Sequence, residues 1–222
     1  MKKIRNPFYI IFLVLVCLAC YQLYSKFLRE NDILRQVIAR LAADSRAAEV
    51  LVTGVQFDEA SKKTYTTIKF LEYDAAGKPL LPKYFTFSGN VIQFQSLVIR
   101  FEDIYIQRGD WLKGKSAYIF WKAFMLDGKN TQEFEINKLN EIPDGYKVPG
   151  LDDPFEHYLW QHFWSYALDP RNGKRSGIKN AQIEAPGTMF VPGVLYTIKI
   201  EHDGGLRIDT TMLSPILKGE QL

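Results

Sequence analysis

Residues 109–116 (GDWLKGKS) form a stretch whose residue types and spacing match a known phosphate-binding device. Gly109, Gly114, Lys115 and Ser116 occupy the defining positions of the P-loop pattern GxxxxGK(S/T). In such a loop, backbone amides surround the phosphates, the lysine reaches the terminal phosphates and the hydroxyl holds Mg²⁺. The match predicts, as one hypothesis, an enzyme that binds a nucleotide.

The surroundings of this stretch favour a plainer interpretation. P-loops lie between a strand and a helix. This sequence shows no alternating strand–helix pattern and no apolar strand that ends in a Mg²⁺-binding aspartate. Asp110 adds negative charge where a phosphate would bind. A chance match is expected in roughly one chain per hundred of this length. We therefore expect a turn between two structural elements and no bound cofactor.

The remaining candidates for chemistry are three histidines and two pairs of adjacent carboxylates. His157 and His162 are five residues apart, about 140° around a helix, so they do not form the i, i+4 pair that chelates a metal ion. His202 lies beside a turn. The pairs Glu102-Asp103 and Asp152-Asp153 place neighbouring side chains on opposite faces of a strand, and helix capping already accounts for the second pair. We expect no catalytic and no metal-binding residues.

Residues 8–24 (FYIIFLVLVCLACYQLY) form an apolar run without a charged residue. A helix of this run spans roughly 26 Å, close to the ~30 Å hydrocarbon core of a membrane. The run suits a retained anchor, a cleaved signal peptide or a lipoprotein signal. The retained anchor is favoured, because the run is long and the residues around Cys20 suit neither lipid attachment nor cleavage before Tyr21, although cleavage after Ala19 would suit them better. Cleavage and lipid attachment at Cys20 stay open.

The tail that precedes the apolar run sets its expected orientation. Residues 1–7 carry three Lys or Arg residues, and such a short basic tail stays in the cytoplasm. Residues 49–222 are therefore expected outside the cytoplasm, on a single pass through the inner (cytoplasmic) membrane. Both cysteines, Cys17 and Cys20, lie within the apolar run, so the chain beyond it has neither a disulfide nor a Cys–His pair.

Residues 25–48 are expected to continue the helix as a stalk. Apolar and small residues alternate here at spacings of four and three, at Phe27, Asn31, Leu34, Ile38, Leu41, Ser45 and Ala48. Isoleucine at a, leucine at d and one asparagine at a are typical of parallel two-stranded coiled coils. Two alternatives stay open: a parallel homodimer through Leu34, Ile38 and Leu41, and a single helix that packs on its own domain or stands alone.

From Glu49 onward the apolar period changes to two, which indicates strands. Runs of this kind cover residues 49–57, 64–73, 83–88, 91–101, 103–107, 194–202 and 206–211, the last two forming a hairpin. A bulge or bend near Gln95-Ser96 would turn both apolar sets of 91–101 inward. Residues 115–126 suit a strand or a helix. The prediction is a mainly β (α+β) fold, either sandwich-like or barrel-like.

One helix is predicted within this β-rich region, from Pro154 to about Leu168. Asp153 supplies the N-cap and Pro154 the first helical position. Trp160 and Trp164 lie within a wide apolar arc, so we expect this face in the core. The alternative is an aromatic face that lies at the membrane surface.

Composition limits the class of partner. The net charge of +3 is too small to indicate nucleic acid, and 12 Tyr with 15 Phe indicate a folded domain. A small basic stretch, with Arg171, Lys174, Arg175 and Lys179, suits a solvated loop better than a contact with anionic headgroups, polyanions or an acidic partner.

Three stretches, residues 95–116, 154–170 and 192–208, resemble uncharacterised bacterial single-pass membrane-anchored proteins of unknown function. This resemblance implies no activity and no site residues. The sequence as a whole predicts an envelope protein that binds a partner, another envelope protein, or acts as a scaffold. The alternatives are a nucleotide-binding enzyme and a carbohydrate- or lipid-binding module.

Overall fold

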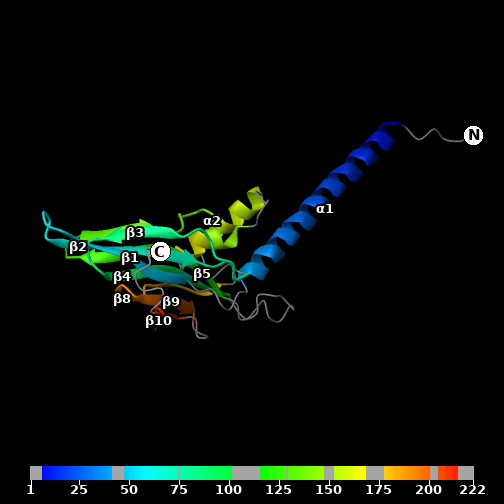
Figure 1. The fold of residues 1–222 in the computed structure, drawn as a ribbon. Coiled ribbons are helices and arrows are strands. Elements are labelled where there is room, and N and C mark those ends of the chain that lie inside the picture. Colours follow the sequence, from blue (N-terminus) through cyan, green and yellow to red (C-terminus); the bar gives the residue numbers. More distant parts are fainter. Residues whose placement is uncertain are drawn as a thin grey trace, which may run out of the picture. The chain divides into compact units, whose positions relative to one another are not determined.

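The computed structural model describes residues 7–41, 48–74, 76–101, 116–128, 130–147, 153–168, 178–200 and 205–214. The chain divides into two compact units, Met1–Val37 and Ile38–Leu222. The first consists of most of one long helix, and the second holds all the strands (Figure 1).

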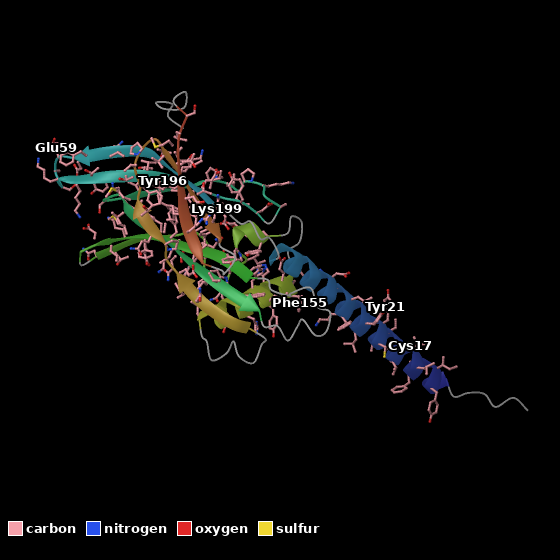
Figure 2. All side chains as sticks on the ribbon, turned by 90° about the horizontal axis from the view of Figure 1, so that it is seen from below. Cys17, Tyr21, Glu59, Phe155, Tyr196 and Lys199 are labelled. Carbon is pink, nitrogen blue, oxygen red and sulfur yellow. The ribbon has the colours of Figure 1, made fainter. Side chains whose placement is uncertain are left out.

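Helix α1 spans Pro7–Leu41 without a break and has 35 residues. Proline occupies its first position, where its missing N–H costs no hydrogen bond. Every side chain from Tyr9 to Arg29 is exposed, and Cys17 and Tyr21 project outward from the helix (Figure 2). This part of α1 is long and apolar enough to cross a membrane.

The second unit contains two five-stranded sheets in which every pair of neighbours is antiparallel. The first sheet has the order β10-β9-β1-β2-β3, with β1 Ala48–Asp58, β2 Lys63–Glu72, β3 Lys83–Phe87, β9 Val194–Ile200 and β10 Leu206–Met212. The second has the order β6-β5-β4-β7, with β8 also paired to β4; its strands are β4 Val91–Phe101, β5 Ser116–Asp127, β6 Asn130–Glu135, β7 Ile178–Glu184 and β8 Gly187–Met189. The mainly β (α+β) prediction is confirmed.

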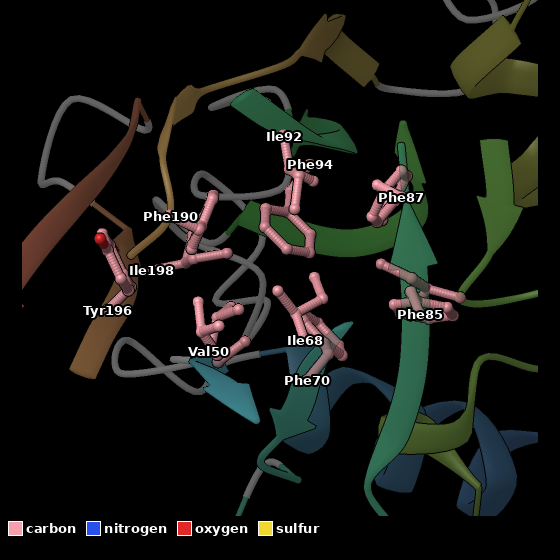
Figure 3. Close-up of a cluster of buried hydrophobic side chains, with 14 of the residues drawn as sticks. Val50, Ile68, Phe70, Phe85, Phe87, Ile92, Phe94, Phe190, Tyr196 and Ile198 are labelled. Atoms are coloured by element: carbon pink, nitrogen blue, oxygen red, sulfur yellow. The ribbon is translucent and has the colours of Figure 1, made fainter. Parts of the chain in front are cut away.

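The inner faces of the two sheets meet in one aromatic core, as in a β-sandwich (Figure 3). Phe70 of the first sheet stacks on Phe94 of the second, with ring centroids 5.3 Å apart. It also meets the edge of Phe120 at 5.4 Å. These three rings lie at most 1% exposed. Burial of such rings is the main force that holds the two layers together.

The register between β4 and β5 shifts between Gln95 and Ser96, where the sequence predicts a bulge. Its effect differs from the prediction. Gln95 pairs with Lys122 and Ser96 with Phe120, so the extra residue is Trp121 of β5 and β4 keeps its alternation. Leu97 therefore points away from the face that carries Phe94, yet it is fully buried. Leu97 is buried although it faces away from the core, because the outer face of the second sheet is covered as well.

Helix α2, Pro154–Leu168, covers the outer face of the second sheet. Trp160 and Trp164 are fully buried, as expected of core residues. The Trp164 indole lies 6.3 Å from that of Trp121 and donates a 2.8 Å hydrogen bond to the carbonyl of Glu141. Asp153 caps the helix by accepting the Phe155 N–H at 2.8 Å.

The boundary between stalk and strand differs by one residue from the sequence prediction. Ala48 was expected in the last d position of a helical stalk, but it is the first residue of β1 and is fully buried in the sandwich core. Residues 42–47, with Ser45, lie outside the described residues. Of the residues in the heptad pattern, those up to Leu41 lie in helix α1.

Candidate functional site

A pocket of about 320 Å³ opens where the β2–β3 connection faces the short 3-10 helix η2, Asp144–Tyr146. Apolar side chains form most of its wall, and three ionisable groups converge on it: its lining residues are Phe70, Glu72, Leu80, Leu81, Pro82, Lys83 and Asp144. Mostly apolar walls with a few placed polar groups are typical of binding sites. We call this hollow the β2–β3 pocket.

The connection between β2 and β3 is held in one conformation by its own hydrogen bonds. The Asp74 carboxylate accepts the N–H groups of Ala76 and Lys78 at 2.8 and 2.9 Å. The N–H of Leu80 then donates to the carbonyl of Glu72 at 2.8 Å. A turn fixed in this way presents Leu81, whose side chain is 88% exposed, at the rim of the pocket.

Lys83 and Asp144 form the polar side of the pocket. The Lys83 ammonium donates to the Asp144 carboxylate at 2.8 Å and to the carbonyl of Ile136. Lys147 donates to the other Asp144 oxygen at 2.6 Å. Burial favours the neutral acid, but hydrogen bonds from Lys147 and Lys83 outweigh it and lower the pKa of Asp144. The carboxylate is therefore ionised at neutral pH.

Asn137 anchors the segment that carries Asp144 to the second sheet. Its amide donates to the Phe120 carbonyl at 2.7 Å, and its oxygen accepts the Asp144 N–H at 2.9 Å. The Tyr146 hydroxyl bonds both the carbonyl and the N–H of Tyr118. Asn137 and Tyr146 thus bond the backbone groups of β5 beyond Lys122, the last residue that pairs with β6. These bonds hold η2 beside β3.

The groups that line the β2–β3 pocket suit binding better than bond cleavage. Glu72 is a carboxylate only 4% exposed, and Asp144 and Lys83 are already engaged with each other. Among the lining residues, all of which are described, there is no Ser, Thr, Cys or His that could act as a nucleophile or a base. The arrangement offers fixed charges beside an apolar wall.

A second hollow of about 260 Å³ lies at the end of the sandwich near the β8–β9 connection. Beyond the bulge at Val52/Gly54, Val55 and Phe57 pair with Thr66 and Thr64, on the face that carries core residues further along the strand. Val55 and Phe57 are 46% and 56% exposed, which shows that this end of the core face is not covered by the second sheet. Its walls are apolar apart from Asn90 and two threonines, so it offers less chemistry than the β2–β3 pocket.

Most of the P-loop-like stretch, residues 109–115 with Gly109, Gly114 and Lys115, lies outside the described residues. Ser116 is described as the first residue of β5, opposite Arg100 of β4. In a P-loop the corresponding residue begins a helix. The nucleotide hypothesis thus lacks its expected helix, and the loop itself stays a sequence prediction.

The other sequence candidates are not gathered into a site in the described part of the chain. His157 is exposed on α2, and His162 bonds the Tyr158 carbonyl through its ring at 2.8 Å. His202, Glu102-Asp103, Asp152 and the basic residues 171–175 lie outside the described residues. Within the described ranges no group of three or more His, Cys, Asp or Glu residues is placed to hold a metal ion.

The residues of the β2–β3 pocket were not predicted as a site. Glu72, Lys83 and Asp144 are separated by 11 and 61 residues, and each belongs to a different element. A signal was present in Lys83 and Glu72, which flank a Pro- and Gly-containing turn between two predicted strands. Charged residues at strand ends are nevertheless so common that only the fold identifies these two.

Comparisons with protein-family models, with curated proteins and with solved structures found no match to this chain.

Proposed function

We propose that this chain is a single-pass membrane-anchored protein of the bacterial cell envelope, whose β-sandwich binds a protein partner outside the cytoplasm. The observation that carries the proposal is the exposed, apolar stretch Tyr9–Arg29 of α1. A helix with no buried side chain in this stretch leaves its apolar surface uncovered in water, whereas a membrane would cover it. The basic residues of the 1–7 tail favour the cytoplasmic side for the N-terminus.

The β2–β3 pocket supports a binding role for the sandwich. Lys83 and Asp144 are held by their contact between β3 and η2, so a partner meets these two charges already in position, at a small entropic cost. The exposed Leu81 side chain at the rim offers an apolar anchor beside these charges. A protein surface that carries both apolar and charged side chains complements this combination.

Anchoring and orientation are tested with reporters fused after Leu222 of the full chain. A reporter active only outside the cytoplasm is expected to be active, and the fusion is expected to stay in the membrane pellet after alkaline carbonate extraction. Activity of a cytoplasm-only reporter would overturn the orientation and would strengthen the nucleotide hypothesis. Release by carbonate would overturn the anchor.

Partner binding is tested by site-specific photo-crosslinking in intact cells. A photoreactive residue replaces Leu81, and the control replaces Leu126, an exposed leucine of β5 that is 63% exposed and does not line the pocket. We expect a discrete crosslinked band from position 81 that is absent from position 126. The proposal for the pocket would be wrong if both positions gave the same products.

A further inference from the structure

Among the described strands, β10 is the outermost strand of the first sheet and has one neighbour, β9. The pairing is regular from Leu206↔Ile200 to Met212↔Val194, and Leu213 N–H then donates to the Gly193 carbonyl at 2.9 Å. In an antiparallel pair, only alternate residues exchange hydrogen bonds with the neighbour. Odd-numbered residues of β10 therefore bond β9, and even-numbered residues direct their backbone N–H and C=O groups to the open edge.

One of these edge groups has a partner that confirms the assignment. The N–H of Leu206 donates to the Glu184 carboxylate at 2.7 Å, away from β9. For the next three edge residues, Ile208, Thr210 and Met212, the described part of the chain provides no partner for the N–H group. Thr210 and Met212 are also exposed. This edge can accept another strand.

The residues of β10 do little to prevent such pairing. Soluble proteins protect open edges with proline, lysine, bulges or inward-pointing charges. Leu206–Met212 (LRIDTTM) contains neither proline nor lysine, and its pairing shows no bulge. Leu206 and Ile208 pack against the core, so the charged residues Arg207 and Asp209 lie on the outer face. Lys199 of β9, drawn in Figure 2, bonds Asp209 at 3.1 Å.

We propose that β10 pairs with β10 of a second copy of this chain, antiparallel about a two-fold axis at Ile208. Within one chain Arg207 already contacts Asp209 at 2.9 Å. In this register Arg207 of each copy also lies directly opposite Asp209 of the other, which adds two symmetric charge pairs to the contacts within each chain. The two Ile208 residues exchange backbone hydrogen bonds, and Thr210 N–H reaches the Leu206 carbonyl of the second copy. Neither bond requires the Leu206 N–H, which Glu184 already holds.

Charge selects this register over the nearest alternative. A slip that keeps the edge groups facing each other moves one strand by two residues. In one direction it places Asp209 opposite Asp209 of the second copy and in the other Arg207 opposite Arg207, and in both cases like charges repel. The paired segment, residues 206–210, is short. Two copies held in one membrane by α1 meet at a high effective concentration, so weak pairing is sufficient. This last step rests on the proposed anchoring; the pairing itself does not.

The test is a charge exchange between copies of the full chain, labelled at the C-terminus with donor or acceptor dyes and mixed in lipid vesicles. Arg207→Asp copies carry two acids at positions 207 and 209, and Asp209→Arg copies carry two bases. Each variant alone is expected to associate about tenfold more weakly than the wild-type chain, because like charges then face each other. A mixture of the two variants is expected to regain wild-type energy transfer, because each acid again faces a base.

A proline and a valine at position 210 provide the matched backbone control. Thr210→Pro removes an N–H that faces the open edge, so it costs no bond to β9 but should abolish the pairing. Thr210→Val keeps the N–H and should associate like the wild-type chain. Melting curves check that each variant is folded. Equal energy transfer for the single variants, their mixture and Thr210→Pro would overturn the proposal. The same mixtures in detergent micelles separate failure of the pairing from failure of the membrane anchor.

Discussion

The ammonium of Lys83 lies 2.8 Å from the carboxylate of Asp144, and this contact links the two sheets across the β2–β3 pocket. Lys83 begins β3 in the first sheet, whereas Asp144 belongs to the segment that Asn137 holds against β5 in the second. The two residues are 61 positions apart. Their contact therefore depends on the complete fold, and it reports on the geometry of the pocket.

Replacement of Asp144 by Asn should reveal this contact through pH. At pH 7 we expect a loss of about 0.5–1 kcal/mol in the free energy of unfolding, since both side chains are partly exposed and solvent screens the pair. The pKa of Asp144 is lowered in the folded chain, so its contribution is complete above the unfolded pKa of about 4 and is lost as the pH falls through the folded pKa. Chemical denaturation at several pH values measures this difference.

The control for Asp144 is Glu141→Gln, which alters an exposed pair with Lys138 at 3.7 Å. Its difference from the wild-type chain should be close to zero at each pH. A pH-independent effect of Asp144→Asn would contradict the assignment of an ionised carboxylate between two lysines.

The Tyr73 hydroxyl donates to the Glu49 carboxylate at 2.7 Å, which gives a second titration test. This hydrogen bond, with burial and the nearby negative charge, raises the pKa of Tyr73 to about 12. A raised pKa stabilises the fold fully below the ordinary value near 10, and the contribution is lost as the pH rises toward 12. The absorbance titration of the wild-type chain should contain a late component that is missing from the titration of Tyr73→Phe. Glu49→Gln should move this tyrosine toward its ordinary pKa.

Much of the sandwich could be predicted because several of its strands carry a clear period of two. The predicted run 91–101 coincides with β4, 64–73 is displaced by one residue from β2, and 83–88 is one residue longer than β3. The side chains of these strands point alternately into the aromatic core and to the opposite face, so apolar residues recur at every second position of the sequence. Residues 115–126, which had no clear period, are largely β5, because both of its faces are covered.

Strands β6, β7 and β8 were not predicted, because these short segments carry few apolar residues in alternation, unlike the edge strands β3 and β10. Asn130–Glu135 is mostly exposed, so five of its six residues are polar and only Phe134 reaches the core rings Phe85 and Phe87. Between β7 and β8, Pro186 interrupts the ladder, yet its carbonyl still accepts the Phe94 N–H at 3.0 Å. The β2–β3 pocket was not predicted because its charged residues are far apart in the sequence. Lys83 and Asp144 come together only when the complete fold has formed.

The stalk hypothesis makes a prediction that differs from the pairing of β10. If Leu34, Ile38 and Leu41 form a parallel coiled coil, Leu34→Glu combined with Leu41→Glu should abolish crosslinking between full-length chains, because two carboxylates would face the seam of each helix. The matched control places Glu at Gln36 and Ala39, which occupy f and b positions outside the seam and give the same change in charge. Loss in the control as well would show that charge in the stalk, rather than the seam, governs association. Persistence in both would assign the contact to residues outside the stalk.

Helix α2 provides the last prediction, because its two interpretations have opposite outcomes. The Trp164 indole is fully buried, contacts Trp121 and donates to the Glu141 carbonyl, so Trp164→Ala should cost on the order of 3–5 kcal/mol. That is a large share of the ~5–15 kcal/mol that stabilises an ordinary domain, and the melting temperature of the full chain in detergent should fall strongly. Tyr158→Ala, on the same helix but 54% exposed, should change it little. If Trp164→Ala melted like the parent but bound liposomes less well, the aromatic face would be a membrane-docking surface, and the function would move toward lipid recognition.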